Sequence, residues 1–238
     1  MIEGEENMKT LILIALLMFV SFNIAPKQNF PEYEFHFKNT NVIGVTGMFD
    51  VNMEKKFALK VMNNKHPRLY VYIDSSGGYL SVVSNMLEIM DAYKGKTRFV
   101  CIARRAYSAA FIFFQNCSVR YMSEYGSLMS HDAGGMIMGE LSRMEKELRV
   151  AKKIYERLSR KTAENMGMPY DEYKQRILGN LWYTFGEAKD AGIIDGKSKS
   201  VSCSKRLIDK EYTVTEKKCS IFKCVDEEVS YSACPLIK

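Results

Sequence analysis

Strand-like and helix-like segments alternate between Asn41 and Asn116, and this alternation constrains the fold more than any other feature. Apolar, β-branched runs recur as NVIGVTGMF, RLYVYID and TRFVCIA, and each is followed by apolar residues at helical spacing. Strands that alternate with helices build a mostly parallel sheet, because each helix returns the chain to the same end of the sheet. The sequence therefore predicts an α/β domain, with helices over residues 52–64, 80–93 and 110–116.

The second half of the chain is expected to contain short strands and one long helix. VRYMS and SLMSH are expected to be short strands on either side of an EYG turn. A long amphipathic helix is expected over residues 138–165, followed by the shorter helix YDEYKQRIL. FGEAKDAGIIDG predicts a helix that stops at Gly192 and a return strand. A long amphipathic helix that protrudes is suited to contacts between copies, so we expect a homo-oligomer.

The N-terminal residues 1–25 have the pattern of a secretory signal peptide. From Met8 the chain reads MKTLILIALLMFVSFNIAPKQ, a lysine followed by an apolar run and then by smaller and polar residues. The acidic MIEGEEN before it is unlike a basic leader, so the natural start is Met1 or Met8. We expect export to the periplasm or the extracellular space, with membrane anchoring through residues 10–22 if the segment is not cleaved.

The cysteines agree with export. A main domain is expected over residues 26–197, and beyond it a hydrophilic tail, 198–238, contains Cys203, Cys219, Cys224 and Cys234. Such a tail has too few apolar residues for its own core and gains from cross-links in an oxidising compartment. Two disulfides are expected there, with the pairing open. Free thiols and zinc are the alternatives, although the tail has no histidine and no C-x2-C pair. Cys101 and Cys117 are expected to be buried thiols.

Charge and motifs exclude several classes of function. The formal net charge is +6, but acidic and basic residues are interleaved and form no basic arm, so no nucleic-acid partner is expected. No G-x-x-x-x-G-K-[ST] motif occurs, so the chain brings no ATPase of its own. Neither a metal site nor a cofactor site is indicated.

Three chemically notable segments follow three successive predicted strands. Ser75-Ser76-Gly77-Gly78 follows RLYVYID, Ser108 lies among alanines after TRFVCIA, and His131 ends SLMSH. The carboxyl ends of parallel strands meet at one edge of a sheet, where ligands bind. A serine, a histidine and a glycine turn that can aim backbone N–H groups are the components of serine hydrolysis. Taken singly, Ser108 also fits a helix N-cap, and His131 a structural histidine.

These segments resemble those of Clp-type serine peptidases. IDSSGGYL is similar to that family's Asn-Ser-Pro-Gly-Gly segment, and AYSAAFI to its nucleophile segment. RYMSEYGSLMSHDAGG resembles the stretch that carries its histidine, and WYTFGEAKDAGIID the segment that closes its domain. The resemblance covers about Asn41 to Asp195 and is closest to the phage and Clp-like branch. It implies the spiral of ββα units shared with crotonases and the hydrolysis of peptide bonds without a cofactor.

The resemblance assigns a role to each matching residue. Ser108 becomes the nucleophile, His131 the general base, and the N–H groups of Gly77 and Ala109 the oxyanion hole. The sequence departs from the family pattern at several positions, which are Ser76 in place of a proline, Arg104 and Arg105 in place of smaller or neutral residues, and Tyr107 in place of an alanine.

The acidic third member of the family's triad is absent. Its position aligns with Arg176 or Asn180, and we assign it to Asn180. Asp132 is adjacent to His131 and would point away from it along a strand. Asp171 and Glu172 are nearby but offset, and a Ser–His dyad is the remaining alternative.

The sequence therefore predicts an exported serine endopeptidase that acts on peptides or unfolded proteins and needs no ATP of its own. Two other functions stay open. A Clp-like binding or assembly protein without activity is favoured by the missing acid. A crotonase-type acyl-CoA enzyme is possible in this fold, but the Ser108 and His131 pair and the expected export argue against it.

Overall fold

The computed structural model describes residues 30–136, 138–219 and 223–237. The chain divides into two units, Met1–Phe30 and Pro31–Lys238, and the second is compact and carries the elements described below. The expected signal peptide and anchor, residues 1–25, lie outside the described residues. In the part of the chain that the structure describes, no helix has the length and apolar character needed to cross a membrane.

The core of the fold is a seven-stranded sheet. Six of its strands follow the order β1-β7-β5-β4-β3-β2, and the seventh, β6, pairs with β5. Every neighbouring pair along this order is parallel, and only the β5–β6 pair is antiparallel. The strands of this sheet are β1 (Glu32–Phe37), β2 (Val42–Phe49), β3 (Arg68–Gly78), β4 (Arg98–Tyr107), β5 (Val119–Ser130), β6 (Leu181–Thr184) and β7 (Gly196–Cys203).

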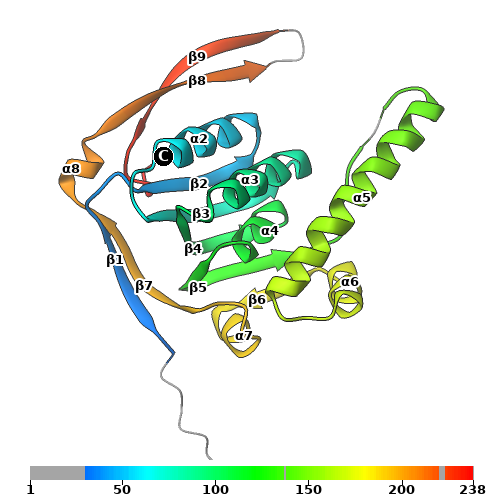
Figure 1. Cartoon of the computed structure of the whole chain (residues 1–238), viewed down its shortest axis with the longest axis horizontal. Coiled ribbons are helices and arrows are strands. Elements are labelled where there is room, and N and C mark those ends of the chain that lie inside the picture. The colour runs from blue at the N-terminus through cyan, green and yellow to red at the C-terminus, as the bar shows by residue number, and fades with distance from the viewer. Residues whose placement is uncertain (1–29, 137, 220–222, 238) are drawn as a thin grey trace, which may run out of the picture. The chain divides into compact units, whose positions relative to one another are not determined.

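Helices follow each of these strands except β1, as Figure 1 shows. They are α2 (Val51–Met62), α3 (Leu80–Tyr93), α4 (Ala109–Gln115), α5 (Leu141–Asn165), α6 (Tyr170–Leu178), α7 (Phe185–Asp190) and α8 (Lys205–Ile208). A separate two-stranded hairpin, β8 (Glu211–Cys219) and β9 (Cys224–Ser232), follows α8.

Most of the elements expected up to α4 are confirmed, and the mostly parallel α/β fold with them. Asp50 caps α2 by accepting the Met53 N–H at 2.9 Å, and the helix buries Met53, Phe57 and Val61. The helix α4 is buried along its whole length and packs on β3, β4 and β5. Phe113 of α4 meets Phe57 edge to face, with ring centroids 5.4 Å apart. The sheet edge where the predicted site residues gather therefore rests on a closely packed aromatic core.

Other elements differ from the sequence-based prediction. VRYMS and SLMS belong to one strand, β5, which ends at Ser130 so that His131 follows it. The pairing of β5 with β4 shifts register between Ala103 and Arg105. A β-bulge of this kind absorbs the extra residues of the EYG segment without ending the strand. The strands β1 and β6, which were not predicted, are short and polar or half-exposed. Pairing with neighbouring strands of the sheet, rather than the hydrophobic pattern of their own residues, stabilises β1 and β6 as strands.

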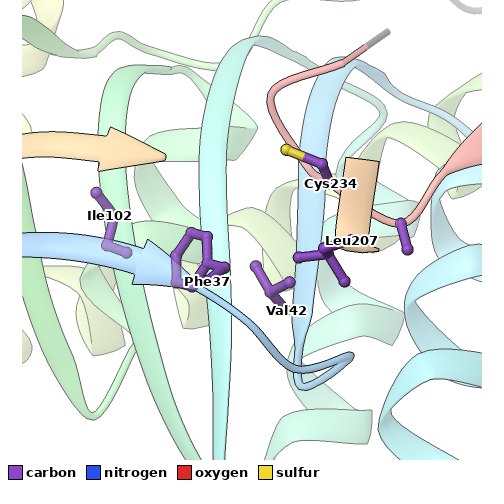
Figure 2. Close-up of a cluster of buried hydrophobic side chains, with 6 residues drawn as sticks. Phe37, Val42, Ile102, Leu207 and Cys234 are labelled. Carbon is purple, nitrogen blue, oxygen red and sulfur yellow. The ribbon is translucent and has the colours of Figure 1, made fainter. Parts of the chain in front are cut away.

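The C-terminal residues fold onto the main sheet. β7 continues to Cys203 and runs beside β1, so regular structure passes through the position where the composition changes. A cluster of buried side chains joins the two parts, as Figure 2 shows, and consists of Phe37, Val42, Ile102, Leu207, Ala233 and Cys234. The tail therefore adds to the core of Pro31–Lys238.

The disulfides agree only in part with expectation. Cys203 and Cys234 form a disulfide, in agreement with the prediction of cross-links in the tail. Cys224 is also disulfide-bonded, and its backbone pairs with that of Cys219 in the β8–β9 ladder. The prediction for Cys101 and Cys117 was wrong, because they form a disulfide with a Cα–Cα distance of 6.0 Å. They meet because α4 packs back along β4. No free cysteine remains among the described residues.

The long helix α5 has two different halves. Its buried residues, Leu158, Ser159, Thr162 and Ala163, all lie toward its C-terminal end. Toward the N-terminal end, Leu141 and Leu148 are exposed, and this half extends beyond the neighbouring helices in Figure 1. The helix is therefore anchored at one end and presents apolar side chains at the other.

The Cys101–Cys117 disulfide yields a stability prediction. The cross-link spans a sequence separation of 16 residues, so its loss should lower the free energy of unfolding by about 3 kcal/mol through the entropy of the unfolded chain. For a chain of this size the double variant Cys101→Ala/Cys117→Ala should melt roughly 6–12 °C lower. Thermal unfolding under non-reducing conditions measures the change. An unchanged melting temperature, together with alkylatable thiols at both positions in the parent protein, would contradict the cross-link.

Candidate active site

Ser108 is the residue at which β4 turns into α4. Its backbone has φ 55° and ψ −121°, a positive-φ conformation that residues other than glycine rarely adopt. The turn is fixed by the Ser108 N–H, which donates to the Met129 carbonyl at 2.8 Å, and by the Ser108 carbonyl, which accepts from Phe111 and Ile112. The side chain makes no capping bond to α4. The helix-cap interpretation of Ser108 is therefore wrong.

The Ser108 hydroxyl lies next to His131 instead. His131 Nε2 and Ser108 Oγ are 2.8 Å apart, which is hydrogen-bonding distance. Both side chains are half-buried, and they come from the carboxyl ends of the neighbouring parallel strands β4 and β5. A neutral imidazole with Nε2 unprotonated accepts the hydroxyl proton in this geometry. The structure thus brings together the predicted nucleophile and the predicted base.

The glycine pair that ends β3, predicted from the sequence as a turn, lies against Ser108. A Cβ atom added to Gly77, at φ 98°, would lie 2.7 Å from both Ser108 Cβ and the Tyr107 carbonyl oxygen, so only glycine fits there. The Gly77 N–H donates to Ser75 Oγ at 3.0 Å, and the Ser75 hydroxyl donates in turn to the Gly47 carbonyl. The Gly77 amide is thus engaged on the β2 side of β3 in this structure.

Two other backbone N–H groups, those of Ala109 and Gly78, are better placed than the Gly77 N–H to bind an anion beside Ser108. Ala109 N would lie 3.0 Å from a Cβ on Gly77, and as the first N–H of α4 it has no acceptor within the helix. N–H groups alternate in direction along a strand, and both Gly77 and Tyr79 donate on the β2 side. The N–H of the intervening Gly78 is therefore expected to face the β4 side, where Ser108 lies.

Asn180 and His131 lie one residue beyond the end of the β5–β6 ladder, and no bond joins their side chains. The antiparallel pairing of β5 and β6 ends at Ser130 and Leu181, so one further step of that register places Asn180 opposite His131. Asn180 has φ 59° and is exposed. In the described parts of the chain no hydrogen bond joins Asn180 to His131. Its catalytic role stays a prediction.

The other candidates for the third position have different contacts. Glu172 and Arg176 form an exposed ion pair with each other on α6. Asp132 accepts the Ala133 N–H at 3.0 Å. Asp171 is exposed on the first turn of α6. Within the described residues, none of these side chains is hydrogen-bonded to His131, which leaves a Ser–His pair as the observed constellation.

Comparison with known proteins decides the family. The sequence model of the Clp protease family, described as "Clp protease", matches residues 36–199, which is more than half of the chain and includes every predicted site residue. The chain belongs to the Clp protease family. The α/β fold and the family predicted from the sequence are both confirmed.

Two similar proteins have low sequence identity to this chain. The ATP-dependent Clp protease proteolytic subunit 2 of Bacillus licheniformis is 28% identical over 126 residues, which cover 52% of this chain and 66% of that protein. Among solved structures, an Asn-to-Asp mutant of ClpP1 from Listeria monocytogenes has a TM-score of 0.59 at 17% identity. The match covers 67% of this chain and 92% of that one, and it shows a shared fold.

Two features of this Clp protease family member were not found from its sequence. Asp74, which is buried, accepts from Arg105 Nε at 2.9 Å and from Arg104 Nη1 at 3.1 Å. These bonds tie the end of β3 to the end of β4, the two strands from which the glycine turn and Ser108 emerge. The available signal was a charged residue after an apolar run, three positions before a glycine pair.

The second feature is a pair of tyrosines whose hydroxyls contact His131 and its neighbour Ser130. The Tyr155 hydroxyl donates to the His131 backbone carbonyl at 3.1 Å, and the Tyr173 hydroxyl is 2.6 Å from Ser130 Oγ. Both tyrosines read as ordinary members of an apolar helix face in the sequence. Their partners become visible only when α5 and α6 pack against the end of β5.

Tyr107, which stands in place of an alanine of the family pattern, contacts residues of the neighbouring strands β5 and β6. Its hydroxyl is 2.6 Å from Ser127 Oγ, and its ring meets that of Trp182 edge to face at a centroid distance of 5.0 Å. The described residues contain no group of three or more histidine, cysteine, aspartate or glutamate side chains that could hold a metal ion. The chemistry that this site can support is that of a serine, a histidine and backbone amides.

Gly77 offers a direct test of this geometry. Gly77→Ala should abolish labelling of Ser108 by a fluorophosphonate probe and lower the melting temperature, because the new Cβ would overlap Ser108 and the φ of 98° is strained for alanine. Gly95→Ala is the matched control, since nothing lies within 4 Å of its added Cβ. Normal labelling of Gly77→Ala would show that Ser108 does not need this close contact.

Proposed function

We propose that this protein is a serine peptidase in which Ser108 is the nucleophile and His131 the general base. The observation that carries the proposal is the 2.8 Å contact between His131 Nε2 and Ser108 Oγ at a strained strand-to-helix turn. Such a turn exposes a serine hydroxyl above the sheet edge, as in other hydrolases with a nucleophile on a sharp turn. Membership of the Clp protease family supports peptides and unfolded proteins as the substrate class.

The chemistry follows from the positions of these groups. His131 Nε2 takes the proton of Ser108 Oγ as that oxygen attacks the peptide carbonyl carbon, which gives a tetrahedral oxyanion. The intermediate collapses, the C–N bond breaks, and His131 returns the proton to the departing amine. A water molecule then hydrolyses the acyl-enzyme by the same route and regenerates Ser108.

The oxyanion is best served by backbone amides near Ser108. The Ala109 N–H fits this role because it begins α4 and faces the glycine turn. The second donor expected from the family resemblance is Gly77, and it could serve only after its bond to Ser75 Oγ breaks. Gly78 fits the role without such a change, so we include Gly78 as the alternative donor from this turn.

Compartment and assembly complete the proposal. The disulfides Cys101–Cys117 and Cys203–Cys234 favour an oxidising compartment, which supports export guided by residues 1–25. The chain would then work apart from a cytosolic ATPase. The exposed Leu141 and Leu148 of α5 support self-association through this helix.

The nucleophile is tested by one substitution with a paired control. Ser108→Ala should remove both fluorophosphonate labelling and peptide hydrolysis, and its melting temperature should stay close to that of the parent, because the side chain caps nothing. Ser81→Ala, at an exposed position of α3, should label and turn over normally. Hydrolysis by Ser108→Ala above roughly a tenth of the parent rate would exclude Ser108 as nucleophile. A parent protein that neither labels nor hydrolyses would favour the binding or assembly alternative.

The third position yields a separate prediction. An asparagine can orient a histidine but cannot supply the negative charge that stabilises the imidazolium, and losing that charge from a serine triad costs about 10⁴ in kcat. If Asn180 faces His131 during catalysis, Asn180→Asp should raise kcat at neutral pH, by well under that factor, and Asn180→Ala should lower it. Steady-state kinetics of the three proteins measure this. Equal kcat values in all three would leave a Ser–His dyad.

A further inference from the structure

Two tyrosine hydroxyls on different helices contact the last residue of β5 and the residue that follows it. Tyr155 of α5 donates to the backbone carbonyl of His131, whereas Tyr173 of α6 bonds the side chain of Ser130. We propose that Tyr155 is a positioning residue for His131, and that Tyr173 serves the stability of the same region. The proposal rests on the function proposed above for Ser108 and His131.

His131 needs such an anchor because it lies beyond the ladders of the sheet. The pairing of β5 with β4 ends at Met129, and its pairing with β6 ends at Ser130. Residues 132–136, which follow His131, are exposed and have no regular secondary structure. The ladders therefore hold the chain up to Ser130 but do not fix the residue whose ring must stay 2.8 Å from Ser108 Oγ.

The Tyr155 hydroxyl is suited to be a lasting donor. Burial, with a smaller contribution from the negative charge of Asp132, raises the pKa of Tyr155 to about 12. The hydroxyl therefore stays protonated at neutral pH and continues to donate to the His131 carbonyl. The bond acts on the backbone and leaves both ring nitrogens of His131 free for proton transfer.

The helix that carries Tyr155 is itself anchored at this point. One turn further along α5, Leu158 and Ser159 are buried, and Lys161 forms an ion pair with Asp91 of α3 at 2.9 Å. Tyr155 thus connects a firmly packed part of α5 to the backbone of His131. Removing its hydroxyl should let His131 move relative to Ser108, and displacements of about 1 Å cost up to 10²-fold in rate.

Tyr155→Phe and Tyr173→Phe form a matched pair, since each removes one hydroxyl from a tyrosine behind β5. Tyr155→Phe should lower kcat about three- to tenfold while KM stays within about twofold, because the substrate still binds but the proton transfer is misaligned. Tyr173→Phe should lower the melting temperature at least as much and leave kcat within about twofold, because it frees a buried serine side chain rather than His131. Equal losses of kcat in the two variants would overturn the positioning role.

A second measurement does not depend on peptidase activity. In NMR spectra of isotopically labelled protein, Tyr155→Phe should shift or broaden the His131 ring signals, whereas Tyr173→Phe should not, with His36 and His66 as internal references. His131 signals that are unchanged in Tyr155→Phe would overturn the inference. If the parent protein proves inactive, the proposed function fails, and this comparison still decides whether Tyr155 positions His131.

Discussion

The backbone of Ser108 is held at φ 55°, and the rest of the site depends on that one strained residue. A non-glycine residue in such a region costs of order 1–3 kcal/mol and persists only where its surroundings determine it. Here the surroundings are the Met129 carbonyl, which accepts the Ser108 N–H, and the Gly77 backbone, which packs against the Ser108 side chain. The strain turns the hydroxyl away from the helix it precedes and toward His131.

The energy that holds this turn comes from the packing behind it. Every residue of α4 is buried, and Phe113 meets Phe49 and Phe57 in the core. The Cys101–Cys117 disulfide closes the segment that contains Ser108. The burial of large aromatic side chains stabilises a fold by several kcal/mol, which is enough to offset the cost of one strained residue. The conformation of Ser108 is thus fixed by the packing of the fold itself.

The amount that could be predicted from sequence differs between the two halves of the chain. The elements from β2 to α4 follow apolar patterns that depend little on context, and their order specifies parallel strands whose carboxyl ends converge. The strands β1, β6, β8 and β9 are polar or half-exposed and were missed, because partners in a sheet stabilise them more than their own composition does. Cys101 and Cys117 were read as thiols because their proximity arises from the return of α4 along β4, which no local pattern records.

By itself the sequence determined the α/β class, the family and the three segments that supply the candidate site, since apolar periodicity, small residues and turns are local properties of the chain. Only the tertiary structure decided what those segments do to one another. It showed that the Ser108 side chain does not cap α4, that the Gly77 amide is engaged by Ser75, and that Asn180 makes no bond to His131 among the described residues. It also joined Tyr155 to the His131 backbone. Such relations depend on distances of a few ångströms between residues far apart in sequence, and these are fixed by the packing of whole helices and strands.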